Sequence, residues 1–344
     1  MIDVIVPARN EQADLEQAAR SILAQRSGNL RVCIVNDHSC DGTAEISTSI
    51  ADSDERVTVI HDPELREGWF GKANAMQTGL EATQTGLETT TAPFVLFTDA
   101  DVIHSLDCFA VALAEMEDRQ LDFISLFPTV QLETFWENVI VPQLMIVGMV
   151  RFLTTRLDDP ASDEAVAAGA MMMTRRTVLD RIGGLAGVKQ EALDDVQLAR
   201  TIKRHGFRTR FYFAPDLLRV RLFKTNRDAF WGFTKNILTA VHPVPLAIPL
   251  MFLPIFVYGT PLLTLMIGVA ENHAWMIASA ASAILAQATL LISASRLCSL
   301  RWSKAVCFPL AAIPIFCCFA SALYHHYVRG GTTWRGRLLP RNRD

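Results

Sequence analysis

Two aspartates separated by a single residue, Asp99 and Asp101, directly follow an uninterrupted apolar run at residues 94–97. The run has the length and composition of a buried strand. Alternate residues at a strand end point the same way, so the two carboxylates can converge on one point. Converging carboxylates repel each other unless a cation or donors lie between them. A hard divalent cation with a bound diphosphate would serve, and two solvated aspartates in a polar turn are the alternative.

Polar loops follow two further strand-like runs near the N-terminus. Residues 3–6 lead into a loop that ends at Glu11, and residues 30–35 lead into a turn cluster, residues 36–43, that opens a helix. A third strand is expected at residues 57–60. Strands that alternate with helices at this spacing predict a parallel sheet, whose ligands lie beyond the carboxyl ends of the strands. The two loops and the paired aspartates fall at that edge, which favours a nucleotide site.

A lysine flanked by glycines follows the third strand. Gly68 and Gly71 permit a tight backbone, and Lys72 stands at the start of a helix expected over residues 73–82. Amide donors and a cation converge at such a helix start, which suits anionic oxygens. Taken alone, the motif fits a surface lysine after a glycine turn equally well.

A second pair of acids, Asp194 and Asp195, begins a helical pattern that Gly206 ends. Two aspartates at a helix start commonly cap the helix, and their alternative role is that of a general base. The segment around Gly169 is rich in small residues, which allow a substrate to approach the backbone.

The character of the chain changes along its 344 residues, which leave room for about two domains. A net charge of −4 argues against a nucleic-acid partner. Up to about Phe233 the sequence is that of a charged α/β domain, whereas long apolar stretches dominate from Val244 onward. The seven cysteines form no C-x-x-C pair and are expected to be reduced. Because the first residues lead straight into a strand, we expect no signal peptide.

Three apolar stretches, residues 244–270, 274–295 and 305–328, are long enough to span a bilayer. The connection 296–304 and the tail 329–344 are basic, and the positive-inside rule places such flanks in the cytoplasm. Both cannot lie there if one full span separates them, so the number of spans stays open. We expect the tail inside and the proline-rich first stretch re-entrant; three plain spans with an external tail are the alternative.

An apolar run within residues 132–157 is too short to cross a bilayer. Aromatic and basic residues flank it, as they do in helices that lie at a membrane interface. We interpret this segment as a helix on the membrane surface, with a buried core helix as the alternative.

Six ordered motifs, over about two thirds of the chain, resemble the inverting family 2 glycosyltransferases of the GT-A fold. They are Val6-Pro-Ala-Arg-Asn-Glu11, Val35-Asn-Asp-His-Ser-Cys-Asp-Gly-Thr43, Gly71-Lys72, Thr98-Asp-Ala-Asp101, Gly169 with Arg175-Arg176, and Leu193-Asp-Asp-Val-Gln-Leu198. A closer likeness is to the hopanoid-biosynthesis-associated and carotenoid (chlorobactene-type) glycosyltransferases. It is carried by Gly68-Trp-x-Gly-Lys72, Asp99-Ala-Asp-Val-x-His104, the acid pair at 194–195 and Trp334-Arg-Gly-Arg337.

The resemblance implies a fold and a set of roles. A Rossmann-like GT-A domain with a mostly parallel sheet would cover residues 1–235, with membrane segments over 236–328 and a basic tail over 329–344. Asp101 and Asp99 would bind Mg²⁺ or Mn²⁺, and Asp195 would be the catalytic base. Contacts to the nucleotide-sugar are implied for Pro7, Ala8, Glu11, Asp37, Lys72, Asp99 and Ala100.

Acceptor or diphosphate contacts are assigned to Gly169, Asp194, Trp231, Trp334, Arg335 and Arg337. Processive relatives carry Gln-x-x-Arg-Trp, of which this chain keeps only Trp231, with Phe230 in place of the arginine. That departure argues against a chain-extending synthase and leaves the diphosphate short of one arginine. The tail arginines are predicted to fill its place, and a basic lipid anchor is the alternative.

The sequence therefore predicts a multi-pass enzyme of the cytoplasmic (inner) membrane whose catalytic domain faces the cytoplasm. It would move a sugar from a nucleotide-sugar, normally a UDP-sugar, to a lipid hydroxyl of the hopanoid or carotenoid type. A polyprenyl-phosphate sugar transferase is the second hypothesis. A non-catalytic nucleotide-sugar-binding membrane subunit is the third, and the intact Asp99, Asp101 and Asp195 speak against it.

Overall fold

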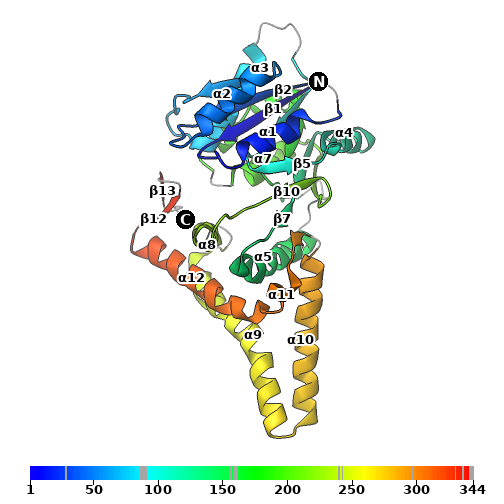
Figure 1. The fold of residues 1–344 in the computed structure, drawn as a ribbon, viewed down its shortest axis with the longest axis vertical. Coiled ribbons are helices and arrows are strands. Elements are labelled where there is room, and N and C mark those ends of the chain that lie inside the picture. Colours follow the sequence, from blue (N-terminus) through cyan, green and yellow to red (C-terminus); the bar gives the residue numbers. More distant parts are fainter. Residues whose placement is uncertain are drawn as a thin grey trace. The chain divides into compact units, whose positions relative to one another are not determined.

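The computed structural model in Figure 1 divides the chain into two compact units. The first comprises residues 1–129 and 152–220, and the second comprises residues 130–151 and 221–344. The structure describes all residues except 28, 86–90, 155–156, 158–161, 192, 239–240, 242, 296, 330, 335–336 and 341–344.

A seven-stranded sheet organises the first unit, with the strand order β3-β2-β1-β4-β8-β6-β9 among the described residues. Neighbouring strands are parallel except at β8, which runs antiparallel to both β4 and β6. The strands are β1 (Ile2–Ala8), β2 (Leu30–Asn36), β3 (Val57–His61), β4 (Phe94–Phe97), β6 (Phe123–Phe127), β8 (Met172–Arg175) and β9 (Thr209–Phe213). A separate antiparallel pair joins β5 (Val102–His104) to β10 (Leu218–Val220).

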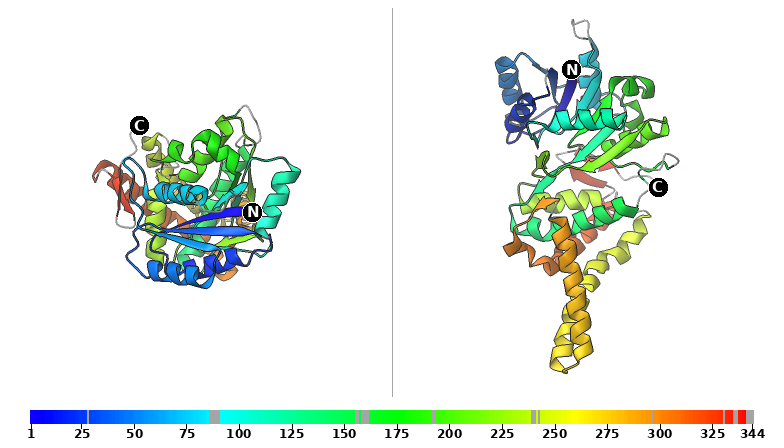
Figure 2. Two further views of the ribbon diagram at one scale, coloured as in Figure 1. Left: turned by 90° about the horizontal axis from the view of Figure 1, so that it is seen from above. Right: turned by 90° about the vertical axis from the view of Figure 1, so that its right-hand side faces the viewer.

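Helices cover both faces of this sheet (Figure 2). The chain moves outward from β1 to β3 and then returns to β4, so right-handed crossovers place α3 on the face opposite α1 and α2. The helices of this unit are α1 (Leu15–Leu23), α2 (Thr43–Ser53), α3 (Gly71–Thr85), α4 (Cys108–Asp118), α6 (Arg176–Ile182) and α7 (Asp194–Arg204).

The main core lies between the central strands and the helices α3 and α7. Fully buried members include Ile5, Phe97, Phe123 and Ile202. Helix α3 approaches β1 so closely that a Cβ at Gly79 would lie 2.6 Å from Ile5 Cγ2. This contact leaves no room for a side chain, and it holds the middle of α3 against the sheet.

A buried carboxylate ties the amino-terminal end of β1 to two arginines. Asp3 is fully buried, and its Oδ1 lies 2.8 Å from Arg31 Nε. Its Oδ2 pairs with the guanidinium of Arg176, which is also buried and begins α6. Because both oxygens have a cationic donor, the desolvation cost of this charge is offset.

The second unit is mainly helical. Its strands form two small pairs, one parallel between β7 (Thr129–Gln131) and β11 (Cys298–Ser299), and one antiparallel between β12 (Gly331–Trp334) and β13 (Arg337–Pro340). Its helices are α5 (Phe135–Thr154), α8 (Asn226–Ile237), α9 (Ala247–Ala270), α10 (Ala274–Ala294), α11 (Trp302–Ala305) and α12 (Ala312–Tyr327).

The amino-terminal half of α5 is buried within the second unit. Val139 and Ile140 pack in a cluster with Ala247 of α9 and with Ile315 and Phe319 of α12. The side chain of Gln143 accepts a hydrogen bond of 2.7 Å from Tyr258 Oη in α9. The first turns of the segment that we expected on the membrane surface thus lie against helices of their own unit.

Three helical segments among the described residues are long and apolar enough to cross a membrane: Val244–Ala270, Ala274–Ala294 and Phe308–Tyr327. Helices α9 and α10 lie side by side as an antiparallel hairpin (Figure 1). Large apolar side chains stand exposed along them, among them Phe256, Met266, Trp275 and Leu285. Such a surface suits contact with lipid rather than water.

Replacing Arg176 by Met should destabilise the first unit, because it removes one of the two arginines that pair with the buried Asp3 and leaves Arg31, which is partly exposed, to pair with it. Breaking a buried pair from one side costs about 3–5 kcal/mol, so we expect the melting temperature to fall by about 6 °C or more. Thermal unfolding of the detergent-solubilised chain measures it. Arg20→Met is the matched control, since Arg20 and Glu16 form an exposed pair on α1. Equal effects of the two substitutions would contradict the importance of the buried pair.

Candidate functional site

The loops after β1 and β2 are fastened to each other at the carboxyl edge of the sheet. Asp37 N–H donates to the carbonyl of Ala8 at 2.8 Å, which extends the pairing of the two strands past their ends. Glu11 N–H donates to Thr43 Oγ1 at 2.8 Å, and Arg9 reaches the Asp37 carboxylate at 3.3 Å. Both carboxylates, Glu11 and Asp37, are buried. Hydrogen bonds and an ion pair therefore join the predicted nucleotide-binding loops into one polar surface.

A second pair of segments meets at the end of β4. Asp99 N–H donates to the carbonyl of Gly169 at 3.2 Å, so the paired aspartates lie beside a turn at residues 168–171. The Thr98 hydroxyl donates to the carbonyl of Ala170 at 2.7 Å from the same strand end. The small-residue segment that the sequence singled out thus lies directly beside the Asp99–Asp101 turn.

A lysine ammonium stands between the two acid pairs. Lys72 Nζ lies 2.7 Å from Asp99 Oδ1 and 4.0 Å from Asp194 Oδ2. Lys72 is the second residue of α3, and Asp194 is the first residue of α7. Two helix starts on the same face of the sheet therefore point a cation and an acid at the carboxyl end of β4.

A side chain at position 169 would displace the Lys72–Asp99 pair. A Cβ there would lie 2.8 Å from Lys72 Nζ and 2.9 Å from Asp99 Oδ2, closer than real Cβ atoms approach. The absence of a side chain lets the backbone of the turn approach the Lys72–Asp99 pair. It also lets Gly169 N–H donate to Asp195 Oδ2 at 3.0 Å.

Backbone amides orient the second acid pair. Asp195 Oδ1 accepts a hydrogen bond of 2.8 Å from Val196 N–H in the first turn of α7, and Oδ2 accepts the bond from Gly169. Asp194 is buried, and its Oδ2 accepts no hydrogen bond from any described residue. The carboxylate of Asp195 is thus held by two donors, whereas Asp194 relies on the nearby lysine.

The crowding of carboxylates shifts their proton affinities. Burial, helped by the negative charge of Asp194, raises the pKa of Asp195 to about 6, although Lys72 opposes the change. Burial and the charges of Asp99 and Glu11 raise the pKa of Asp101 to about 7. Burial disfavours the ammonium of Lys72, but the carboxylates of Asp194, Asp99 and Asp195 outweigh it and raise the Lys72 pKa. The site therefore carries more negative charge than its lysine neutralises.

That excess negative charge is the observation that fits a divalent cation. Asp99 and Asp101 offer hard oxygen ligands of the kind that Mg²⁺ and Mn²⁺ prefer. Among the described residues, no group of three or more His, Cys, Asp or Glu side chains could hold a metal ion on its own. A metal here would need further oxygens, which a diphosphate supplies.

Sequence reasoning found most of this cluster and left two of its neighbours without a role. Lys72, Asp99, Asp101, Gly169, Asp194 and Asp195 come together, and Pro7, Ala8, Glu11, Asp37 and Ala100 lie along the same edge. The hydroxyls of Thr98 and Ser125 were missed. Polar residues at buried positions of otherwise apolar strands are the signal that could have found them.

The remaining site residues belong to the second unit. Trp231 lies on α8, where its ring makes an edge-to-face contact with His325 of α12, with the ring centroids 5.5 Å apart. Trp334 and Arg337 face each other across the β12–β13 pairing. Arg335 lies outside the described residues.

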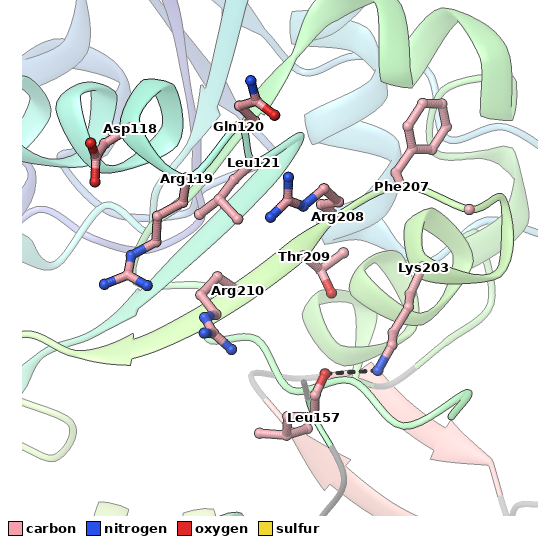
Figure 3. A pocket seen from close by; sticks show the side chains of 11 residues that line it. Asp118, Arg119, Gln120, Leu121, Leu157, Lys203, Phe207, Arg208, Thr209 and Arg210 are labelled. Carbon is pink, nitrogen blue, oxygen red and sulfur yellow. Dashed lines mark hydrogen bonds between the residues drawn. The ribbon is translucent and has the colours of Figure 1, made fainter. Parts of the chain in front are cut away.

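A cavity of the first unit lies elsewhere (Figure 3). It measures about 470 Å³ and opens at the amino-terminal ends of β6 and β9, the opposite edge of the sheet. Two of its cations already have partners: Lys203 Nζ donates to the carbonyls of Leu157 and Glu164, and Arg119 pairs with Glu115. Its lining includes none of the predicted site residues. The cavity therefore carries no argument about the reaction.

Known proteins share both the sequence pattern and the fold. An uncharacterized glycosyltransferase of Bacillus subtilis, EpsJ, is 28% identical over 124 residues, which cover 36% of this chain and 33% of that protein. The 4,4'-diaponeurosporenoate glycosyltransferase of Staphylococcus aureus is 24% identical over 243 residues, covering 69% of this chain and 61% of the relative. The chain thus spans between one third and about three fifths of these relatives.

A solved structure supports the same architecture. The mannosyltransferase PcManGT from Pyrobaculum calidifontis, in complex with GDP-Man and Mn²⁺, aligns with 95% of this chain and 87% of its own, at 21% identity and a TM-score of 0.50. Residues 3–183 of the present chain, more than half of it, match the family described as glycosyl transferase family 2. The match to the family model establishes that the chain belongs to glycosyl transferase family 2, and the mostly parallel sheet is that of the GT-A fold.

Proposed function

We propose that this chain is a membrane-bound inverting glycosyltransferase that moves a sugar from a UDP-sugar to a lipid hydroxyl. The observation that carries the proposal is the cluster of Asp99, Lys72 and the Asp194–Asp195 pair at the carboxyl edge of the sheet. It combines a cation that can bind a diphosphate with an oriented carboxylate that can accept a proton. The polar surface formed by the loops after β1 and β2 would hold the nucleotide, with Asp37 facing the base.

Asp195 acts as the general base in this proposal. It takes the proton of the acceptor hydroxyl as the hydroxyl oxygen attacks the anomeric carbon. The bond from that carbon to the diphosphate oxygen breaks with its electron pair on the diphosphate, and the configuration inverts. Lys72 lies where the departing negative charge develops and stabilises it.

Asp101 and Asp99 would hold the divalent cation, Mg²⁺ or Mn²⁺. When bound, the cation supplies Lewis-acid stabilisation to the diphosphate oxygens. Pairing with Lys72 orients the Asp99 carboxylate beside Gly169.

The lipid acceptor rests on the second unit and on the relatives. The exposed apolar surfaces of α9 and α10 would keep the enzyme at a membrane, where an amphiphilic acceptor concentrates. Relatives named 4,4'-diaponeurosporenoate glycosyltransferase point to a carotenoid or similarly extended lipid. A polyprenyl-phosphate acceptor would bring more negative charge to a cluster that already has an excess. We therefore favour a neutral hydroxyl.

The packing of the second unit favours a specific topology. If the antiparallel hairpin α9–α10 spans the bilayer, the linker after α10 returns to the side from which α9 entered. Consistent with this, Arg301 N–H donates to Asn138 of α5, and Lys304 donates to the carbonyl of Glu133. Helix α12 packs along the first half of α9, between Ala247 and Tyr258, rather than along its full length. An interfacial α12 would place the basic linker and the basic tail on one side, the cytoplasmic side.

Asp195→Asn should reduce turnover about 10²–10⁴-fold, because the amide keeps the shape but cannot accept the proton. With a base whose pKa is near 6, the wild-type rate should fall tenfold per pH unit below pH 6 and level off above it. The variant should lose this acidic limb while UDP affinity stays near wild type. Steady-state rates against pH and UDP titrations provide the measurements. If Asp195→Asn keeps full activity and Asp194→Asn is inactive, the roles of the two acids must be exchanged.

Donor binding should require a divalent cation. Asp101→Asn should abolish turnover, and excess EDTA should do the same to the wild-type chain until Mn²⁺ is restored. Isothermal titration with UDP, with and without Mn²⁺, measures the dependence. Asp107→Asn is the control, because Asp107 pairs with Arg26 on the exposed surface. Unchanged turnover in EDTA would contradict the metal assignment.

The tail is proposed to contact the diphosphate through Arg335 or Arg337, with Trp334 near the acceptor. An arginine fork binds phosphate oxygens in a bidentate manner that lysine cannot reproduce. The double replacement of Arg335 and Arg337 by Lys should therefore lower turnover about tenfold or more while membrane association stays unchanged. Full activity of this variant, or labelling of the tail from outside the cell, would leave only the role of a basic lipid anchor.

A further inference from the structure

We infer that His104 is a positioning residue, which acts through the Thr98 hydroxyl on the 168–171 turn and so keeps Asp99 and Asp195 in register. His104 ends β5, three residues after Asp101, and touches neither acid. The inference rests on the proposed roles of Asp99 and Asp195.

Hydrogen-bond geometry determines which way each proton points. Thr98 Oγ1 lies 2.7 Å from the carbonyl of Ala170 and 3.2 Å from His104 Nε2. A carbonyl can only accept, so the single Thr98 hydroxyl proton goes to Ala170. His104 must therefore donate from Nε2 to Thr98.

The surroundings of the imidazole fit this neutral, donating form. His104 is buried, and its ring makes an edge-to-face contact with Phe109, with the ring centroids 5.3 Å apart. Burial lowers the pKa of His104 to about 3, so the ring stays uncharged at working pH. On its other side, Nδ1 lies 3.4 Å from Ser21 Oγ, whose hydroxyl donates to the carbonyl of Ala18 at 2.7 Å and accepts a hydrogen bond from the backbone N–H of His104 at 3.1 Å. The backbone of His104 is thus fastened to α1.

The turn that Thr98 holds makes contact with both proposed functional acids. Its Gly169 carbonyl accepts from Asp99 N–H, and its Gly169 N–H donates to Asp195 Oδ2. The same turn is held on its far side by Ser125, whose hydroxyl accepts from Ala168 N–H at 2.9 Å. Fixing the Ala170 carbonyl through Thr98 therefore restrains the neighbouring Gly169, whose C=O and N–H contact the two acids.

His104 supplies the hydrogen bond that the Thr98 oxygen accepts. Without a donor at Nε2, this buried oxygen would lose that partner, which is costly, and the hydroxyl that binds Ala170 would be held from one side only. An error of about 1 Å at a catalytic group can cost about 10²-fold in rate. His104 thus acts on the rate through geometry, without contacting the substrate.

The test is hydrogen exchange across the 168–171 turn, measured by mass spectrometry on the full chain in detergent. Thr98→Val and His104→Leu should each speed exchange of this turn about tenfold or more. Thr98→Ser keeps the hydroxyl and His104→Gln keeps a donor, so both should stay near wild type. The Thr98→Val/His104→Leu double variant should exchange no faster than the faster single variant, because both act through one path.

Thr174→Val is the matched control, since Thr174 is an equally buried threonine of β8 whose hydroxyl donates to the carbonyl of Asp122. It should leave the turn protected. Faster exchange throughout β1 and β2, additive effects in the double variant, or no rescue by Thr98→Ser would each overturn the inference.

Turnover of UDP-glucose with Mn²⁺, with water as acceptor, provides the second measurement. Thr98→Val and His104→Leu should lower kcat about tenfold and leave the donor KM within about twofold. A larger change in KM than in kcat would overturn the inference. If the wild-type chain does not turn over this donor, the proposed function fails on that point, while the exchange data still decide the role of His104.

Discussion

Repulsion between carboxylates at one edge of the sheet is the constraint on which the site depends. Asp99 and Asp101 come from the end of β4, and Asp194 and Asp195 come from the start of α7, with the Lys72 ammonium between the two pairs. In water such a group would simply separate, but here each acid is fixed by backbone that belongs to the core. The helix starts of α3 and α7 add amide dipoles that favour negative charge at this point. The fold thus holds an excess of negative charge, which fits the cation and the diphosphate of the proposed function.

The precision of the cluster comes from groups with no charge at all. Gly169 allows the backbone to reach both acids, and the Ser125 and Thr98 hydroxyls hold the turn from opposite sides. Behind them, Gly79 lets α3 rest on β1, which sets the place of Lys72 at the start of that helix. The acid cluster at this edge of the sheet is therefore supported by tight packing between α3 and β1 behind it.

The sequence predicted the strands and the acid pairs well, because both depend on local pattern. Residues 94–97 form β4 with the predicted bounds, and Asp194 and Asp195 begin α7. The antiparallel β8 and the contact between Lys72 and Asp99 were not predicted, since each joins segments far apart along the chain. The packing of the first turns of α5 against α9 and α12 was not the preferred interpretation, because an apolar face does not reveal whether lipid or protein covers it. The place of this helix at a membrane interface stays a prediction.

The charge of the edge also constrains what the acceptor can be, under the proposed function. Asp195 functions as a base only if it is ionised, and Asp194 and burial both work against ionisation, while Lys72 works for it. A second anion beside Asp195 would raise its pKa further and remove the base at neutral pH. A neutral hydroxyl adds no such charge and donates its proton directly to the carboxylate. The same electrostatics that call for a cation at Asp99 and Asp101 therefore favour an uncharged acceptor at Asp195.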